Sequence, residues 1–343
     1  MFDLLRRLTQ TPGGPGLEDE IRSLVRGELE AHVDEVRMDR LGNLDFIKRG
    51  SGDGPVVMIA AHMDQIGFMA THIDKNGYIR LNPTGGFDPR TMMNQRVMVY
   101  GKKPLPGVMG SKPKHILTDE ELKKPLKVKD YFVDVGLPGD TVKELVQPGD
   151  RILWMGDCIE MGEMYCSRAM DDRIGVLLMI EAMKRVKNPS ATIHAVATVQ
   201  EEVGIRGAWA SAAQIKPDIG LALDVTIAND VPGSPEHEAV TRMGDGIAVK
   251  MMDGASISSI KLVRHLEDIA DANDIKHQRE ILPAGGTDAG AIWRVPGGAH
   301  VCTLSVPSRY VHSTVELVHK DDVDGGVKLL AAWLEVVGER DYA

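Results

Sequence analysis

The sequence predicts an α/β fold in which a mostly parallel sheet is flanked by helices and interrupted by a small β-rich domain. Apolar runs of strand length alternate with stretches of helical periodicity, and the 43% hydrophobic composition supplies a large core. A change in composition predicts the insertion, because residues 71–164 hold 8 of the 18 prolines and several turn signals. We therefore expect an α/β domain made of residues 1–70 and 165–343, and an inserted domain, 71–164.

The expected elements of the α/β domain follow one another along the chain. Two helices, at 2–9 and 17–32, come first, and the second carries Ile21, Leu24 and Val25 at helical spacing. The apolar run from Val56 to Ala60 predicts a buried strand. Further strands are expected at 192–199, 218–225, 247–251 and 300–306, and further helices at 174–186, 207–215, 257–271 and 320–337. Such alternation is typical of a parallel sheet covered on both faces.

The inserted stretch has shorter elements. Turn signals such as Pro148-Gly149-Asp150 separate short strands at 96–100 and 151–155. Thr118 and Glu121 have the spacing of a capping box at the start of a helix. A β-rich unit has strand edges that need cover, which makes this domain a candidate for contacts between subunits.

Charge, hydropathy and cysteine content argue against several classes of protein. The net charge is −10 and no basic cluster is visible, which argues against nucleic acid as a partner. Apolar runs are far shorter than the ~20 residues of a membrane span, and the first residues lack the order of a signal peptide. Cys158, Cys166 and Cys302 form no CxxC pair, which fits a reducing compartment. We expect a soluble, cytoplasmic protein that does not bind membranes.

Acids and histidines gather where the predicted strands end. They are His62 and Asp64, Glu201 and Glu202, Asp224, and His312, with Asp171 and Asp172 before a helix. Sites in open α/β sheets form beyond the carboxyl ends of strands, so these side chains can converge. Each also has an ordinary explanation, since an Asp can cap a helix or open an Asx turn. The functional interpretation depends on their conjunction.

The combination of residue types indicates a metal centre. Three carboxylates in one dry cleft repel one another, so protonation or a bound cation must reduce this repulsion. With two imidazoles added, the set suits zinc, cobalt or manganese. Five protein ligands exceed what one tetrahedral catalytic ion needs, whereas two ions that share a carboxylate would each have about three. The pattern therefore favours a two-metal hydrolase.

The chain also resembles a known family, in segments that occur in a fixed order. They are AAHMDQIGF, AMDDRIG, VQEEVGIRGA, ALDV and YVHST, with GGFDPR, GSKPKH and AGGTDAGAI matching as well. These segments are similar to the intracellular co-catalytic metallo-aminopeptidases of the glutamyl and tetrahedral aminopeptidase family, over nearly the whole chain. The resemblance implies removal of N-terminal residues from short peptides. It also implies that the insertion assembles dimers into a hollow tetrahedral dodecamer.

The resemblance also implies a role for each candidate residue. Two divalent ions, zinc or cobalt with manganese as an alternative, would be held by His62, Asp171, Glu202, Asp224 and His312. Asp171 would bridge the ions, with Asp172 as the alternative bridge. Asp64 would fix the tautomer and basicity of the His62 imidazole from outside the ligand set. Glu201 would be the general base that takes a proton from a water made acidic by the ions.

Other chemistries fit the sequence less well. Glu201 and Glu202 could suggest a glycosidase, but its carboxyls stand about 5 to 9.5 Å apart across the bond, and adjacent residues project in different directions. Gly204 to Gly207 is a partial dinucleotide motif, and Gly285 to Asp288 lacks the lysine of a phosphate loop. Cys302 lies in a predicted strand, where it is expected in the core. The sequence leaves two alternatives open. One is a carboxypeptidase or N-deacylase of the same superfamily, and the other is a noncatalytic metal-stabilised assembly protein.

Overall fold

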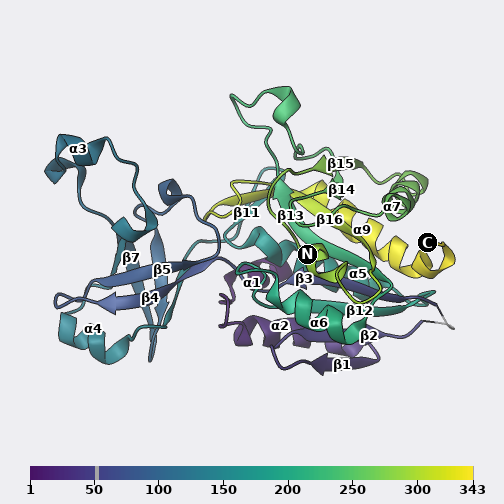
Figure 1. Ribbon diagram of the computed structural model, residues 1–343, viewed down its shortest axis with the longest axis horizontal. Coiled ribbons are helices and arrows are strands. Elements are labelled where there is room, and N and C mark those ends of the chain that lie inside the picture. The colour runs from purple at the N-terminus through teal and green to yellow at the C-terminus, as the bar shows by residue number, and fades with distance from the viewer. Residues whose placement is uncertain (51–53, 343) are drawn as a thin grey trace.

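A large sheet with helices on both faces forms one body of the protein, and a closed β-barrel projects from one end of it (Figure 1). The computed structural model describes residues 1–50 and 54–342. Both the α/β class and the β-rich insertion predicted from the sequence are confirmed.

Parallel strands occupy the middle of the large sheet. β12 (Thr192–Thr198), β3 (Val56–His62), β13 (Ile219–Ile227) and β16 (His300–Arg309) lie side by side in this order and run in the same direction. Antiparallel strands extend the edges: β2 (Leu44–Lys48) and β1 (Glu35–Met38) on one side, and β17 (Glu316–His319), β11 (Met164–Ser167) and β10 (Ile159–Met161) on the other. β14 (Ile247–Met252) pairs with β16 and with β15 (His277–Ile281). The parallel strands therefore end at one common edge.

Helices cover both faces of this sheet. On one face α5 (Met170–Arg185) packs across β3 and β13 between α2 (Asp19–Leu29) and α9 (Lys320–Val336), which also contact the sheet. α1 (Phe2–Gln10) packs on α5, and α7 (Ile260–Ala272) packs against β14 and α9. Almost every α5 residue up to Met183 is buried, because the helix lies between the sheet and other helices. On the other face α6 (Arg206–Ile215) and α8 (Ala289–Ile292) pack over small side chains such as Ala60 and Ala222.

The inserted unit is a barrel with its own core. Its strands run around it in the order β4 (Gly67–Ile73), β5 (Ile79–Thr84), β8 (Phe132–Asp134), β7 (Pro104–Gly110), β6 (Arg96–Tyr100) and β9 (Arg151–Trp154). Burial alternates along β7, as expected of a strand with one face inward. The short helices α3 (Asp119–Leu122) and α4 (Gly139–Leu145) lie outside the barrel (Figure 1). The predicted capping box is confirmed, because Thr118 and Glu121 each accept the other's backbone N–H.

Most predicted elements lie within a few residues of the observed ones, and two helix starts differ. The helix expected from 257 begins at Ile260, because Ile257 still pairs with Met252 in a β-bridge. α5 begins earlier than expected, but Asp171 and Asp172 have non-helical backbone angles, so the regular helix starts after them. Within the described part of the chain, no helix combines the length and the apolar character needed to span a bilayer.

Candidate metal centre

The predicted site residues converge at the common edge of the parallel strands. His62 ends β3, Asp224 lies in β13, the Glu201–Glu202 pair follows β12, and His312 follows β16. With Asp171 from the start of α5, they line a cavity of about 290 Å³ whose other walls are Gly86, Ile205, Gly285 and Gly286. Gly86 follows β5 of the barrel, so both bodies of the protein contribute to this cavity.

Asp171 lies between the two histidines. Its Oδ1 is 3.0 Å from His62 Nε2, and its Oδ2 is 3.2 Å from His312 Nε2. Burial acts to raise the pKa of Asp171, but the hydrogen bonds from His312 and His62 outweigh it and hold that pKa below the usual range. Burial acts to lower the pKa of His312, yet Asp171 and the charge of Glu202 raise it to about 10. One carboxylate thus contacts both imidazoles through different oxygens.

Asp172 has a different environment from its neighbour. Its Oδ2 accepts a hydrogen bond from His62 N at 3.2 Å, and its Oδ1 accepts one from Gly175 N at 2.9 Å. Potential ligand atoms of His62, Asp172 and Asp224 lie within 4.8 Å of one another, as do those of His62, Asp171 and Glu202. Both acids therefore reach the centre, but Asp172 also holds the backbone of β3 and α5.

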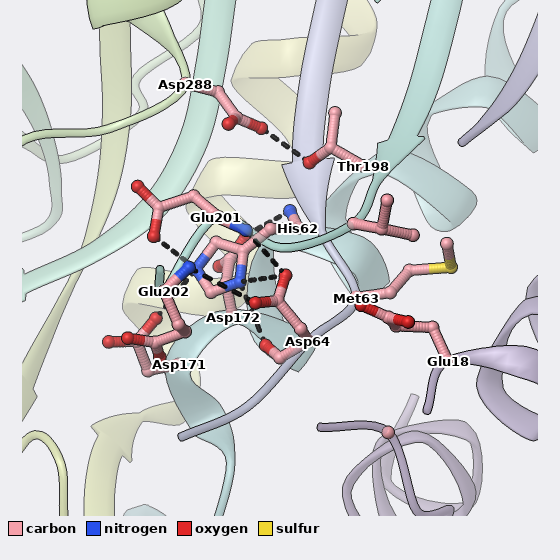
Figure 2. A network of polar contacts seen from close by, with 12 residues as sticks. Glu18, His62, Met63, Asp64, Asp171, Asp172, Thr198, Glu201, Glu202 and Asp288 are labelled. Carbon is pink, nitrogen blue, oxygen red and sulfur yellow. Dashed lines mark hydrogen bonds and ion pairs between the residues drawn. The ribbon is translucent and has the colours of Figure 1, made fainter. Parts of the chain in front are cut away.

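Asp64 is fully buried behind His62 and beside the two glutamates (Figure 2). Its carboxylate accepts hydrogen bonds from Glu201 N at 2.9 Å and from Glu202 N at 3.2 Å. The Nδ1 atom of His62 lies 2.9 Å from the Asp64 backbone oxygen and 3.6 Å from its Oδ1. The backbone oxygen thus orients the imidazole so that Nε2 faces Asp171, while the carboxylate orients the chain that carries the glutamates.

The two glutamates differ in their contacts. Glu201 Oε2 is 4.0 Å from His62 Nε2, and within the described residues the Glu201 carboxylate accepts no hydrogen bond. Glu202 Oε2 is 3.5 Å from His312 Nε2, whereas its Oε1 is buried with no hydrogen-bond partner in the described chain. Burial raises the pKa of both glutamates, and nearby carboxylates raise it further. Burial and the charge of Asp171 likewise raise the pKa of Asp224 to about 8.

This donor set fits divalent cations. Glu202 Oε1 is buried without a hydrogen-bond partner among the described residues, and several neighbouring carboxyl groups have raised pKa values. Both features indicate crowded negative charge that a bound cation would neutralise. Imidazole nitrogens together with carboxylate oxygens are ligands for zinc, cobalt and manganese.

Two further buried acids border the centre, and the sequence alone assigned neither a role. Asp288 accepts a hydrogen bond from Thr198 Oγ1 at 2.6 Å, close to Glu201 (Figure 2). Glu316 accepts hydrogen bonds from the backbone of His312 and Asp171. The AGGTDAGAI segment gave a signal for Asp288, whereas only its position four residues after His312 marks Glu316.

Comparison with known proteins identifies the family. The family model described as M42 glutamyl aminopeptidase matches residues 42–329. This chain belongs to the M42 family. A putative aminopeptidase of Acetivibrio thermocellus is 39% identical over 333 residues, which cover 96% of this chain and 97% of that protein.

Solved structures of relatives agree with the M42 assignment. The TET aminopeptidase of Thaumarchaeota archaeon SCGC AB-539-E09 has a TM-score of 0.94 at 35% identity, with coverage of 97% of this chain and 95% of that one. The TET1 peptidase of Pyrococcus horikoshii, which can assemble into a tetrahedron or a large octahedral shell, has a TM-score of 0.86 at 32% identity, covering 97% and 98%. M42 peptidases are metallopeptidases, so this chain is a metal-dependent aminopeptidase, as its motifs predicted.

Proposed function

We propose that this M42 enzyme removes N-terminal residues from short peptides with two divalent ions and with Glu201 as general base. The observation that carries the proposal is the position of Asp171, whose two oxygens face different histidines. In this proposal Asp171 would hold both ions, and His62, Glu202, Asp224 and His312 would be the remaining ligands. Zinc or cobalt suits these donors, with manganese as an alternative.

The chemistry divides between the ions and the chain. When bound, the ions supply a water of lowered pKa and polarise the scissile carbonyl. Glu201 has no hydrogen bond to another described side chain, so its carboxylate is free to accept the proton of the attacking water. Glu201 then donates that proton to the nitrogen of the departing amine. Asp64 holds the base beside the neighbouring ligand Glu202 through the backbone amides of both.

A substrate comparison tests this function against its alternatives. Metal-free enzyme is reconstituted with zinc or cobalt and offered aminoacyl anilides beside their N-blocked versions. We expect cleavage of the free-amine substrates only. Release of the blocking acyl group, with the anilide bond intact, would instead favour an N-deacylase. No cleavage of either kind at full metal occupancy would contradict the proposal.

We also propose that the α/β domain, expected at residues 1–70 and 165–343, is catalytic and that the inserted domain, expected at 71–164, mediates assembly. Its barrel strands run from Gly67 to Trp154, and β10 belongs to the large sheet. The inserted unit exposes apolar side chains at Val108, Ile116 and Leu122, and the TET1 relative can assemble into a tetrahedron or a large octahedral shell. We expect a cytoplasmic homo-oligomer, a dodecamer built from dimers, and the free thiols of the three buried cysteines fit a reducing compartment. Light scattering tests the assembly, and a monomer at working concentration would contradict it.

A further inference from the structure

Glu316 lies where two ligand-bearing segments meet. It is the first residue of β17, which pairs antiparallel with β11 so that Ser167 is opposite Glu316. β11 leads directly to Asp171 at the start of α5, and β17 begins four residues after His312. Strand pairing therefore brings one side chain within reach of both segments.

The carboxylate of Glu316 accepts three backbone hydrogen bonds. Oε1 accepts from His312 N at 2.7 Å and from Ser313 N at 3.4 Å, while Oε2 accepts from Asp171 N at 3.2 Å. Each oxygen thus holds a different segment. The side chain is only 2% exposed, so water hardly competes for these amides, and a lost bond would leave a buried polar group unpaired.

Both segments depart from common backbone geometry close to these hydrogen bonds. His312 has a φ of 61°, and Ala169, two residues before Asp171, has a φ of 56°. Residues other than glycine seldom adopt this left-handed region, and such conformations persist only where the surroundings hold them. The bond from His312 N to Glu316 supplies such a restraint for the histidine.

We propose that Glu316 is a positioning residue of the metal centre, which sets His312 relative to Asp171 by holding both backbones on one carboxylate. The inference rests on the proposed two-metal function. Two other buried acids make comparable contacts to two other ligand-bearing segments, Asp64 to the glutamate pair and Asp172 to His62. Removing an outer partner of a metal ligand typically costs 10- to 100-fold in metal affinity.

Metal affinity tests this role without depending on activity. The full-length, metal-free protein is titrated with Zn²⁺ in competition with a chromophoric chelator. Glu316→Gln keeps the size of the side chain but replaces one acceptor oxygen with an NH₂ donor that faces a backbone N–H. We expect the affinity for at least one ion to fall about 10- to 100-fold. We also expect the absorption spectrum of the Co²⁺-loaded variant to change, because the ligands shift.

Asp322→Asn is the matched control. Asp322 is buried and accepts hydrogen bonds from Gly244 N at 2.7 Å and Gly246 N at 2.9 Å, in a turn that carries none of the proposed ligands. The control should lose thermal stability but keep the wild-type metal affinity and Co²⁺ spectrum.

The possible results separate the inference from the proposed function. Wild-type affinity and spectrum in Glu316→Gln would overturn the positioning role, and so would an equal loss of affinity in Asp322→Asn. If Glu316→Gln does not fold, the Zn²⁺ titration is repeated with Glu316→Asp, which keeps both acceptor oxygens on a shorter side chain. Wild-type metal affinity in that variant would likewise overturn the positioning role. A wild-type protein that binds no metal would refute the proposed function itself.

Discussion

Replacing Glu201 with glutamine separates proton transfer from metal binding. The Glu201 carboxylate accepts no hydrogen bond from the described residues, and its Oε2 lies 4.0 Å from His62 Nε2, so glutamine breaks no hydrogen bond of the side chain. General acid–base catalysis contributes about 10²- to 10⁴-fold in rate. This factor corresponds to about 2.7 to 5.4 kcal/mol of activation free energy. We expect Glu201→Gln to lower kcat by that factor while the metal content stays unchanged.

The assay combines hydrolysis of an aminoacyl anilide with elemental analysis of the same sample. Glu202→Gln is the matched control at the adjacent position, because Glu202 Oε2 lies 3.5 Å from His312 Nε2 and its buried Oε1 has no hydrogen-bond partner in the part of the chain that the structure describes. The control should lose metal as well as turnover. Full activity of Glu201→Gln at full metal content would refute the assignment of the base, and so would an equal loss of metal in both variants.

Three further outcomes are expected from the same geometry. Asp171→Asn should weaken the binding of both ions, since its two oxygens face different histidines, and two ions retained after dialysis would contradict the bridge. Asp64→Asn replaces one of the two acceptor oxygens with an NH₂ group that faces a backbone N–H, and it should lower the unfolding free energy by about 1–3 kcal/mol, so an unchanged denaturation midpoint of the metal-free variant would count against it. Burial raises the pKa of Asp224 and of Glu316 to about 8, so the folded, metal-free protein binds protons that the unfolded chain has lost. The thermal midpoint of chelator-treated protein should therefore fall as the pH rises from about 5 to 8. A midpoint that rises over this range would contradict the raised pKa values of these carboxyl groups.

The centre of the sheet could be predicted from the sequence, and its edges could not. β3, β12, β13 and β16 are apolar because both of their faces are buried, and this makes them visible as runs of strand length. β10 and β17 are short and carry acids such as Glu160 and Glu316, so their pairing depends on partners far away in the chain. Closure of the barrel depends on the same kind of distant pairing.

The location of the candidate site was predictable for a related reason. Parallel strands end at one edge, so polar residues that follow them meet there without any further information. The atom that each side chain presents was not predictable. The family resemblance implied that Asp64 fixes the His62 imidazole, but the carboxylate of Asp64 accepts hydrogen bonds from the amides of the glutamate pair while its backbone oxygen contacts the imidazole. Glu316 and Asp171 are 145 positions apart, and strand pairing alone brings them together.

A crystal structure of the zinc-loaded protein, with anomalous data collected at the zinc edge, shows whether two ions bind between His62 and His312. We expect two zinc peaks in each chain, about 3.5–4 Å apart, with Asp171 bound to both. A single peak, or a pair of peaks that His62 or His312 does not contact, would contradict it.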